Sequence, residues 1–372
     1  MKALYINSRP DAHRNPGGDN TQLTCTRAAV ETLGVEVTLA EPGDLERLSG
    51  YDLAHVFNIQ TPESAWRVFQ ALQSGGIPIV LSPIYWDMYE YWAENALRDL
   101  SRWRLLGRVL SRQLAARVYL CWQKLKAPRN EEWKIQRRLL SQAGRVLPNS
   151  ASEGALLSNT FNLSRGFKDK IDIIPNGVEL EQYRALPDPD PEFIQKYGVR
   201  DFVLQVGSIN PVKNQLGLIQ ALFSLPIPIV FVGKVADAYT GYGDACKALG
   251  AARGAVYFVD HVPHARLPGI YALAAVHALP SWRETPGLAS LEAAAAGRPI
   301  VTTSIGSTRD YFGGEAWYCH PGDPQSVRRA VEAALSAAPS EGLRSRVLSE
   351  FTWEKAGQKT LQAYQRLLAS QN

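Results

Sequence analysis

The chain has 372 residues, of which 45% are hydrophobic and 20% are charged. This length suits two domains of ordinary size, and the composition lets both halves bury a core. The apolar run near the start, Ala3 to Ile6, is too short for a secretory signal, and no run approaches a membrane-spanning helix. We therefore expect a cytoplasmic protein. The four cysteines are far apart, form no CxxC pair and predict reduced thiols rather than metal ligands: Cys25, Cys121, Cys246 and Cys319.

Charge is distributed unevenly. The whole chain has a formal net charge of +4. Between Arg98 and Leu140 there are twelve Lys or Arg and three Asp or Glu, so this segment is +9 and the remainder sums to −5. A local basic surface is therefore expected, with a partner or a structural reason of its own.

Short apolar runs alternate with helical patterns from one end of the chain to the other. In the first half, the predicted strands are Lys2–Ile6, Val35–Ala40, Leu53–Phe57, Ile77–Ser82, Arg145–Asn149 and Ile171–Pro175. In the second half, they are Phe202–Gly207, Ile227–Gly233, Ala255–Val259, Val276–Ser281, Arg298–Thr303 and Ala316–Cys319. Nearly continuous apolar strands with helices between them indicate an α/β fold with two parallel, doubly wound sheets.

The Pro- and Asp-rich segment RALPDPDPEF breaks both periodicities and marks the joint between the domains. We expect an N-terminal domain at 1–185 with a basic helical insertion at about 98–140, and a second domain at 186–352. A closing helix at 353–372 is expected to return to the first domain. Ligands of such sheets bind beyond the carboxyl ends of the strands, so the expected active site is the interdomain cleft.

One stretch of the second half, PSWRETPGLASLEAAAAGRPIV, contains two glutamates eight positions apart, Glu284 and Glu292. Thr285 is expected to cap the following helix, with Pro286 in its first turn. Gly287 and Leu288 would then present backbone N–H groups at the positive end of the helix, which suits a phosphate. Each glutamate alone could be a surface charge; together, around this helix start, they indicate a site for a sugar and a phosphate.

These residues resemble the E-x7-E signature of family 4 glycosyltransferases, which have the GT-B fold of two facing Rossmann-like domains. The resemblance covers most of the chain. Other segments similar to that family are GGDN (17–20), YDLAHVFN (51–58), RVLPNSASEGALL (145–157), IIPNGVELEQY (173–183), VGSINPVKNQ (206–215) and FTWEKAGQ (351–358).

The resemblance implies roles for individual residues. Glu292 would bind the nucleotide ribose, Glu284 would contact the donor sugar, and the N–H groups near Gly287 and Leu288 would hold sugar or diphosphate. Lys213 would neutralise the diphosphate leaving group, the main catalytic work expected.

Further donor-side candidates are a glycine turn near the start of the chain and two residues of the stretch FVDHV. The residues of FVDHV would lie near the nucleobase of the donor. The four donor-side candidates are Gly17, Gly18, His261 and Val262. Candidates for the sugar or acceptor side are Asp19, Tyr85 and Trp86. Most of these residues also have a structural alternative that remains open. The glycines could form an ordinary turn, His261 could be a surface residue, and the aromatic residues could pack in the core.

Two positions depart from the family pattern. Ser208 stands where the family usually has an arginine that shares the diphosphate with the lysine. The stretch LSPIYWD, 81–87, lacks the first-domain histidine that many members place near the donor sugar. His55 lies inside a predicted strand and is expected to be structural.

No cofactor or metal is expected. Asp188 and Asp190 have the D-x-D spacing of metal-dependent glycosyltransferases, but they lie in the Pro-rich joint. Charge on the diphosphate would be met by Lys213 and by helix ends.

The basic segment from Arg98 to Leu140 contains a row of apolar residues four apart, a second row of arginines, and three tryptophans. The rows are Leu106, Leu110, Leu114, Val118 and Trp122; Arg104, Arg108 and Arg112; and the tryptophans are Trp103, Trp122 and Trp133. Three interpretations remain open: a helical insertion with solvated arginines, an amphipathic surface that docks on an anionic membrane, or a nucleic-acid surface.

The resemblance therefore implies a retaining, metal-independent glycosyltransferase that moves a sugar from a nucleotide-diphosphate donor to a sugar or lipid-linked hydroxyl acceptor. The expected setting is surface polysaccharide or glycolipid assembly in the cytoplasm, at the inner face of the membrane if the basic segment docks there. Two alternatives remain open: a nucleotide-sugar epimerase of the same fold, and a non-catalytic nucleotide-sugar-binding or scaffold protein.

Overall fold

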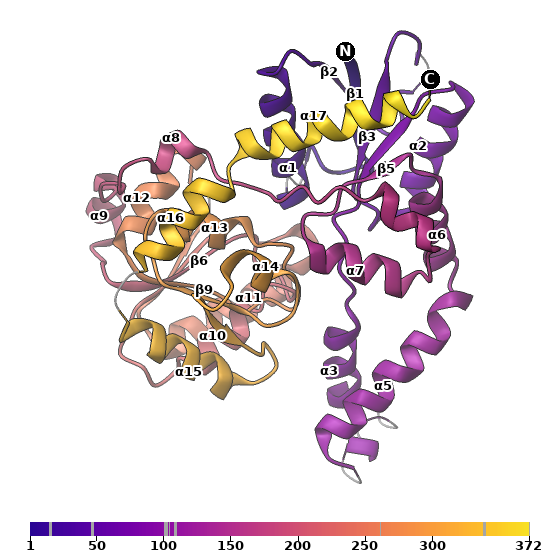
Figure 1. Cartoon of the computed structure of the whole chain (residues 1–372). Coiled ribbons are helices and arrows are strands. Elements are labelled where there is room, and N and C mark those ends of the chain that lie inside the picture. The colour runs from indigo at the N-terminus through magenta and orange to yellow at the C-terminus, as the bar shows by residue number, and fades with distance from the viewer. Residues whose placement is uncertain are drawn as a thin grey trace. The chain divides into compact units, whose positions relative to one another are not determined.

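The computed structural model describes residues 1–14, 17–45, 48–99, 103, 105–107, 110–260, 262–337 and 340–371 (Figure 1). The chain forms two compact units: Met1–Pro175 with Glu354–Asn372, and Asn176–Trp353. The sequence-based boundary lies ten residues later, between 185 and 186. By contact, the intervening segment belongs to the second unit, since Val178 forms a short parallel bridge with Thr352 and its N–H donates to Phe351 O at 2.9 Å.

The sheet of the first unit is parallel, with strand order β2-β1-β3-β4-β5. Its strands are β1 (Lys2–Asn7), β2 (Glu36–Ala40), β3 (Leu53–Phe57), β4 (Ile79–Ser82) and β5 (Arg145–Val146). The predicted strand Ile171–Pro175 is wrong: only an isolated bridge joins Ile171 to Val146. Pro148, two residues after Val146, has no N–H to extend the ladder, although its carbonyl accepts from Ile174 N at 3.0 Å.

Helices flank this sheet and bury its apolar side chains (Figure 1). The helical segments of this unit are α1 (Gly18–Glu31), α2 (Pro62–Ser74), α3 (Tyr89–Asp99), α5 (Arg112–Lys126), η1 (Ala127–Arg129), α6 (Glu131–Gln142), α7 (Ala151–Thr160), η2 (Arg165–Lys170) and α17 (Trp353–Ala369). Of these, α3 and α5 pack on each other and extend away from the sheet (Figure 1). Helix α17, from the C-terminal end, packs against β1 and β3. Its Tyr364 hydroxyl lies 2.5 Å from Tyr5 Oη and 2.7 Å from His55 Nδ1. His55 is therefore a buried structural residue, and burial lowers its pKa to about 3.

The basic segment is divided among α3, α5, η1 and α6. Helix α5 begins after Ser111, whose hydroxyl accepts from Leu114 N at 3.3 Å. The row of apolar residues does not share one environment: Leu114 and Val118 are exposed, whereas Trp122 is half-buried. Steps of four residues turn about 40° around a helix, so such a row drifts off a face. Arg104, Arg108 and the side chain of Arg112 lie outside the described residues.

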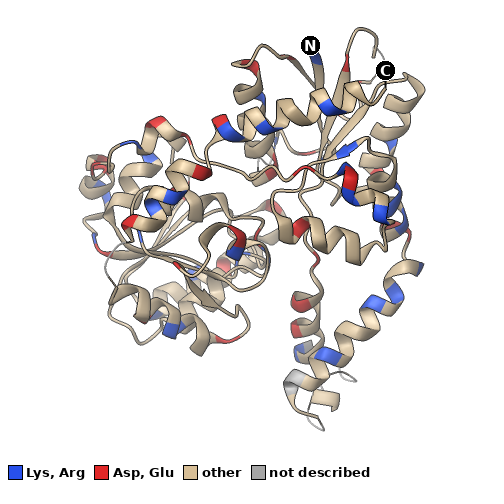
Figure 2. Cartoon of the chain, viewed as in Figure 1, with Lys and Arg blue, Asp and Glu red and all other residues tan. Residues whose placement is uncertain are grey.

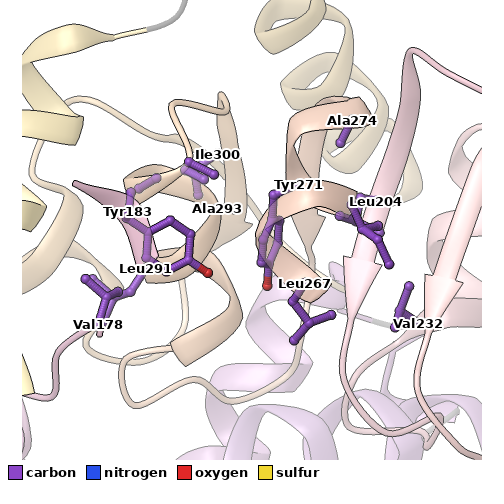
Figure 3. Close-up of a cluster of buried hydrophobic side chains, with 14 of the residues drawn as sticks. Val178, Tyr183, Leu204, Val232, Leu267, Tyr271, Ala274, Leu291, Ala293 and Ile300 are labelled. Atoms are coloured by element: carbon purple, nitrogen blue, oxygen red, sulfur yellow. The ribbon is translucent and has the colours of Figure 1, made fainter. Parts of the chain in front are cut away.

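The second unit contains a six-stranded parallel sheet with order β11-β10-β9-β6-β7-β8. Every strand predicted in this half is present: β6 (Phe202–Val206), β7 (Ile229–Val232), β8 (Val256–Val259), β9 (Ala274–Leu279), β10 (Ile300–Thr303) and β11 (Trp317–Cys319). One face of the sheet packs on a cluster that includes Leu204, Tyr271 and Leu291 (Figure 3). The other face packs on a cluster that includes Val203, Leu218 and Val331.

The helical segments of this unit are α8 (Leu180–Tyr183), α9 (Pro191–Tyr197), α10 (Gln215–Ala221), η3 (Asp237–Tyr239), α11 (Thr240–Arg253), η4 (His264–Arg266), α12 (Leu267–Leu273), α13 (Leu288–Ala295), α14 (Thr308–Phe312), α15 (Pro324–Leu335) and α16 (Glu341–Glu350). In each sheet the strand order reverses at one point, between β1 and β3 in the first unit and between β6 and β9 in the second. Loops that leave the carboxyl ends of strands at such a reversal are the usual ligand site of open α/β sheets.

Candidate active site

A turn after β6 positions Lys213. The chain leaves the strand at Gly207, whose φ of 143° favours glycine, and folds back at Asn210. The Asn210 side-chain oxygen accepts from Val212 N at 3.0 Å and from Lys213 N at 3.1 Å. This side chain closes the turn locally, so the backbone of Lys213 has a defined position.

The loop after β9 is fastened to that turn. Trp282 N donates to Val212 O at 2.7 Å, and the Asn214 amide donates to Pro280 O at 3.2 Å. Two loops far apart in sequence are thereby joined at the strand-order reversal.

The contact brings Lys213 and Glu284 together. Lys213 Nζ lies 2.7 Å from Glu284 Oε1, with side-chain exposures of 27% and 5%. A carboxylate this deeply buried needs a charged partner, and a lysine that keeps part of its surface in solvent can still approach an anion. The two residues expected to perform catalysis therefore form one ion pair.

Helix α13 begins at Leu288, so the expectation of a Thr285 cap with Pro286 in the first turn is wrong. The chain first turns at Gly287, which has φ 87° and whose carbonyl accepts from Ser290 N and Leu291 N at 2.9 and 3.2 Å. A Cβ at Gly287 would lie 3.2 Å from Glu284 Oε2. Glycine here lets Glu284 lie against the helix start, where the first N–H groups have no partner within the helix.

Glu292 lies in the same helix and makes a separate set of contacts. Its Oε1 is 2.8 Å from His264 Nε2, and its Oε2 accepts from the Tyr271 hydroxyl at 3.0 Å. The hydrogen bond to Glu292 raises the pKa of His264. The Tyr271 ring belongs to the buried cluster of Figure 3, so it holds the carboxylate at the edge of the core.

Sequence reasoning missed His264 and Tyr271 as partners of Glu292. The only signal was the position of His264, five residues after β8, at the carboxyl edge that contains the other loops. Nothing in the order of residues pairs it with Glu292, because 28 residues separate them.

Beneath the site, β9 and α13 are joined by a buried histidine. His277 Nε2 lies 3.1 Å from Ser290 Oγ. Burial and the charge of Lys213 lower the pKa of His277 to about 3, so it is neutral in the folded protein at ordinary pH.

The remaining donor-side candidates are placed as follows. Ser208 is exposed, and its hydroxyl accepts from the Asn210 amide at 2.9 Å. Val262 is half-buried and packs against the core cluster. His261 lies outside the described residues.

One member of the D-x-D pair, Asp190, occupies a structural position. Asp190 caps α9, accepting from Phe193 N at 2.7 Å, and both its oxygens bind the Arg266 guanidinium at 2.7 and 2.8 Å. The hydrogen bonds from Arg266 hold the pKa of Asp190 below its ordinary value. This carboxylate is engaged as a helix cap.

In the first unit, Gly17 precedes α1 in an extended conformation and Gly18 begins it. Asp19 is buried at the reversal between β1 and β3, with both oxygens bound by Arg9 at 2.9 and 3.1 Å. Asn58 donates to Oδ2 at 3.1 Å. Burial alone would raise the pKa of Asp19, but these partners lower it. Arg9, which sequence reasoning did not single out, contributes the charge here.

Tyr85 and Trp86 lie in the loop after β4. The Tyr85 ring packs on Phe161, with centroids 5.2 Å apart, and its N–H donates to Glu153 Oε1 at 2.7 Å. Glu153 is fully buried, which raises its pKa to about 7, although Asn149 N also donates to it at 2.6 Å. Trp86 is half-buried. Tyr85 therefore belongs to the core of its unit, and a role of either aromatic side chain at an acceptor stays a prediction.

Residues 188–346 match the model of the family Glycosyl transferases group 1. A D-inositol 3-phosphate glycosyltransferase from Nocardia farcinica is 28% identical over 60% of this chain and 52% of its own length. An O-antigen chain mannosyltransferase B from Escherichia coli is 28% identical over 47% of this chain and 49% of its own. The chain thus spans about half the length of these curated relatives.

Solved structures agree on the fold. Sucrose-phosphate synthase from Thermosynechococcus elongatus has a TM-score of 0.77 and 18% identity, with both chains fully covered. Anabaena HepE in complex with UDP and glucose has a TM-score of 0.70 and 16% identity, covering 98% of this chain and all of that one. The expectation of an α/β, GT-B fold with two parallel-sheet Rossmann-like domains is confirmed. The stretch that matches the glycosyl transferases group 1 model, 188–346, contains Lys213, Glu284 and Glu292.

Proposed function

We propose that the protein transfers a sugar from a nucleoside-diphosphate sugar to a hydroxyl acceptor, with retention of configuration at the anomeric carbon. The observation that carries this proposal is the arrangement around α13. An ion pair of Lys213 and Glu284 lies at the helix start, and Glu292 follows eight positions later. All three lie beyond the strand-order reversal of the domain that matches the family.

Each group has a role in this proposal. Lys213 and the free N–H groups at the start of α13 hold the diphosphate and stabilise its charge as it leaves. Glu284 accepts from the donor sugar's hydroxyls. Glu292 accepts from the ribose hydroxyls, which replace His264 and Tyr271 as its partners.

In the reaction, the acceptor oxygen forms a bond to the anomeric carbon while the bond from that carbon to the diphosphate oxygen breaks. The acceptor attacks from the face that the diphosphate leaves, and the leaving-group oxygen takes the acceptor's proton. No dedicated nucleophile or base is needed for this route.

The names of the similar proteins support this reaction class. Two are a glycosyltransferase and a mannosyltransferase, and HepE was solved in complex with UDP and glucose. We further propose that the acceptor is a sugar hydroxyl, that the protein acts in polysaccharide or glycolipid assembly, and that it is active without metal.

Ser208 leaves the diphosphate with one fewer positive charge than the family pattern implies, and we propose that Lys234 supplies it. The loops after β6 and β7 are in close contact, since Ile209 N donates to Lys234 O at 2.8 Å. A Cβ at Gly233 would overlap the carbonyl of Gly207. Lys234 follows Gly233 directly, and its side chain is exposed.

Calorimetric titration with UDP, GDP, ADP, dTDP and CMP in EDTA tests the donor site. One diphosphate should bind, and Glu292→Ala or Lys213→Ala should each weaken it by about 1–3 kcal/mol, as loss of a charged hydrogen bond does. Lys234→Gln should weaken it in the same direction. Lys247→Ala and Glu332→Ala, exposed charges on α11 and α15, are matched controls that should change nothing.

Two further measurements separate the alternatives. Conversion of the donor sugar without any acceptor would identify an epimerase. Failure of every nucleotide to bind, or binding unaffected by the Glu292 and Lys213 variants, would favour a scaffold protein. Loss of turnover in EDTA with rescue by Mn²⁺ would contradict the metal-independent route.

A further inference from the structure

Helix α5 of the first unit has an apolar stripe on its exposed side. The exposed fractions are 46% for Leu114, 41% for Val118 and 78% for Leu125. Cys121 is exposed between them. The spacing of four, three and four residues places these side chains within about 60° of one another around the helix.

The opposite side of α5 already has a partner. Ala115 and Tyr119 are buried with Ala93 and Leu97 of α3, and Trp103 completes this small core. The Trp103 and Tyr119 rings meet edge to face, with centroids 5.0 Å apart. In Figure 1, α3 and α5 lie side by side and extend away from the sheet of their unit. The exposed stripe is therefore a second apolar face, separate from the one that holds the helix in place.

Charge on α5 has one sign. Its charged residues are all basic, and Figure 2 shows blue bands along the helix with no red ones. Arg117 and Lys124 are exposed, seven positions apart, and border the stripe along one side. On its other side lies Trp122, with Lys126 Nζ 3.7 Å from the ring centroid.

We propose that this stripe docks the first unit on an anionic lipid surface, with α5 lying in the plane of the interface. An exposed aliphatic stripe bordered by Lys and Arg, with a tryptophan at its edge, is the pattern of helices that insert one face into the acyl boundary. The basic side chains would reach the phosphates of the headgroups.

The shape and chemistry favour lipid over the other partners. Single-stranded nucleic acid is bound by basic and aromatic side chains, whereas the stripe itself presents exposed aliphatic side chains and its tryptophan is half-buried. Helix α5 has 15 residues, fewer than a bilayer requires. Within the described part of the chain, no helix is long and apolar enough to cross a membrane. The proposal is independent of the donor site, because the two share no residue.

Sedimentation with vesicles tests it. The whole protein should bind vesicles of phosphatidylcholine and phosphatidylglycerol mixed at about two to one, and should bind pure phosphatidylcholine weakly. Arg117→Gln with Lys124→Gln should weaken binding about thirtyfold at low salt, since each basic residue near an anionic surface is worth about fivefold. Val118→Gln with Leu125→Gln should weaken it more than about tenfold, through lost apolar burial.

Matched controls come from the same unit. Leu33 and Leu39 are 39% and 49% exposed, and their double change to Gln should leave vesicle binding intact. Arg165→Gln with Lys168→Gln removes two exposed charges from η2 and should also have little effect. A circular dichroism spectrum and a thermal unfolding transition like those of the wild type would show that each variant is folded.

Three results would overturn the proposal. One is no binding to anionic vesicles at low salt. Another is equal loss of binding in the stripe variants and in the controls. The third is a wild-type dimer by light scattering that the Val118 and Leu125 changes dissociate while vesicle binding stays the same, because the stripe would then join two copies of the chain.

Discussion

At the scale of single residues, the site is defined by which carboxylate holds which partner. Glu284 binds Lys213 at 2.7 Å, and Glu292 binds His264 at 2.8 Å and Tyr271 at 3.0 Å. The first pair is needed to keep a buried charge in the folded protein. The contact of Glu292 with His264 puts a histidine at the position where we expect ribose hydroxyls. These two pairs predict different responses to mutation and to pH.

Replacing Lys213 with Met should lower the free energy of unfolding by about 1–3 kcal/mol, because Glu284 would stay buried without its cation. Adding Glu284→Gln to Lys213→Met should recover part of that loss. Urea denaturation of the wild type, both single variants and the double variant gives the coupling. The exposed pair Lys134–Glu131 is the control, and Lys134→Met should change stability by less than about 0.5 kcal/mol. Additive effects of the two changes would contradict the ion pair.

Nucleotide affinity should depend on pH through His264. Its pKa is raised above the ordinary 6.5 by the hydrogen bond to Glu292. The stabilisation from this pair is therefore fully present below the unfolded pKa and is lost as pH rises through the folded pKa. Because protonated His264 competes with ribose for Glu292, diphosphate affinity should increase over that same rise in pH.

Calorimetric titration from pH 5.5 to about pH 8.5 covers the titration of a histidine. His264→Gln should flatten the profile, whereas the same change at His320, an exposed histidine after β11, should preserve it. Affinity that falls with rising pH in the wild type would contradict the competition.

At the scale of elements, the start of α13 depends on a glycine with a backbone conformation that residues with a side chain rarely adopt. Gly287 has φ 87°, and it brings Glu284 Oε2 to 3.2 Å from the place a Cβ would take. The helix therefore begins at Leu288, four residues after Glu284, rather than at the Thr-Pro pair.

Gly287→Ala should destabilise the protein by about 1–2 kcal/mol through the left-handed conformation, and should also weaken diphosphate binding by displacing Glu284. Thermal unfolding and calorimetry measure the two effects. Gly241→Ala in α11 is the control, because its φ is ordinary and no atom lies within 4 Å of the added Cβ. A Gly287→Ala protein with wild-type nucleotide affinity would show that the turn does not position the site.

At the scale of the whole molecule, the two ends of the chain meet in the first unit. Helix α17 follows the second unit in sequence yet packs on β1 and β3, through Tyr364 and its contacts with Tyr5 and His55. The integrity of the first unit thus depends on the last residues of the chain.

Tyr364→Phe should lower stability by about 1–3 kcal/mol, because Tyr5 Oη and His55 Nδ1 both lose a buried partner. Nucleotide affinity should stay nearly unchanged, since Lys213, Glu284 and Glu292 all lie in the second unit. Denaturation monitored by circular dichroism, with and without the diphosphate, separates the two effects. Tyr239→Phe, which alters an exposed tyrosine, should have no effect on stability. Equal loss of stability in both variants would contradict a role for the buried hydroxyl.

The fold class could be predicted from the order of residues, and so could the position of Lys213 and Glu284 in loops that follow strands. Continuous apolar strands, glycines after strands and the spacing of Glu284 and Glu292 are local patterns, and they predicted every strand of the second sheet. The proline that ended β5 early is local too, but its effect depends on the neighbouring segment, so the strand at Ile171–Pro175 was predicted wrongly.

Local patterns in the sequence specify which side chains are available at the carboxyl edge of the sheets, because Lys213, Glu284 and Glu292 follow or adjoin strands whatever their partners. The pairing of Lys213 with Glu284, of Glu292 with His264 and Tyr271, and of α17 with β1 arises only when distant elements pack together. Such packing also decides which face of α5 stays exposed. The physical reason is that side-chain pairing across tens or hundreds of residues depends on packing of distant elements, and no periodicity within one segment records it.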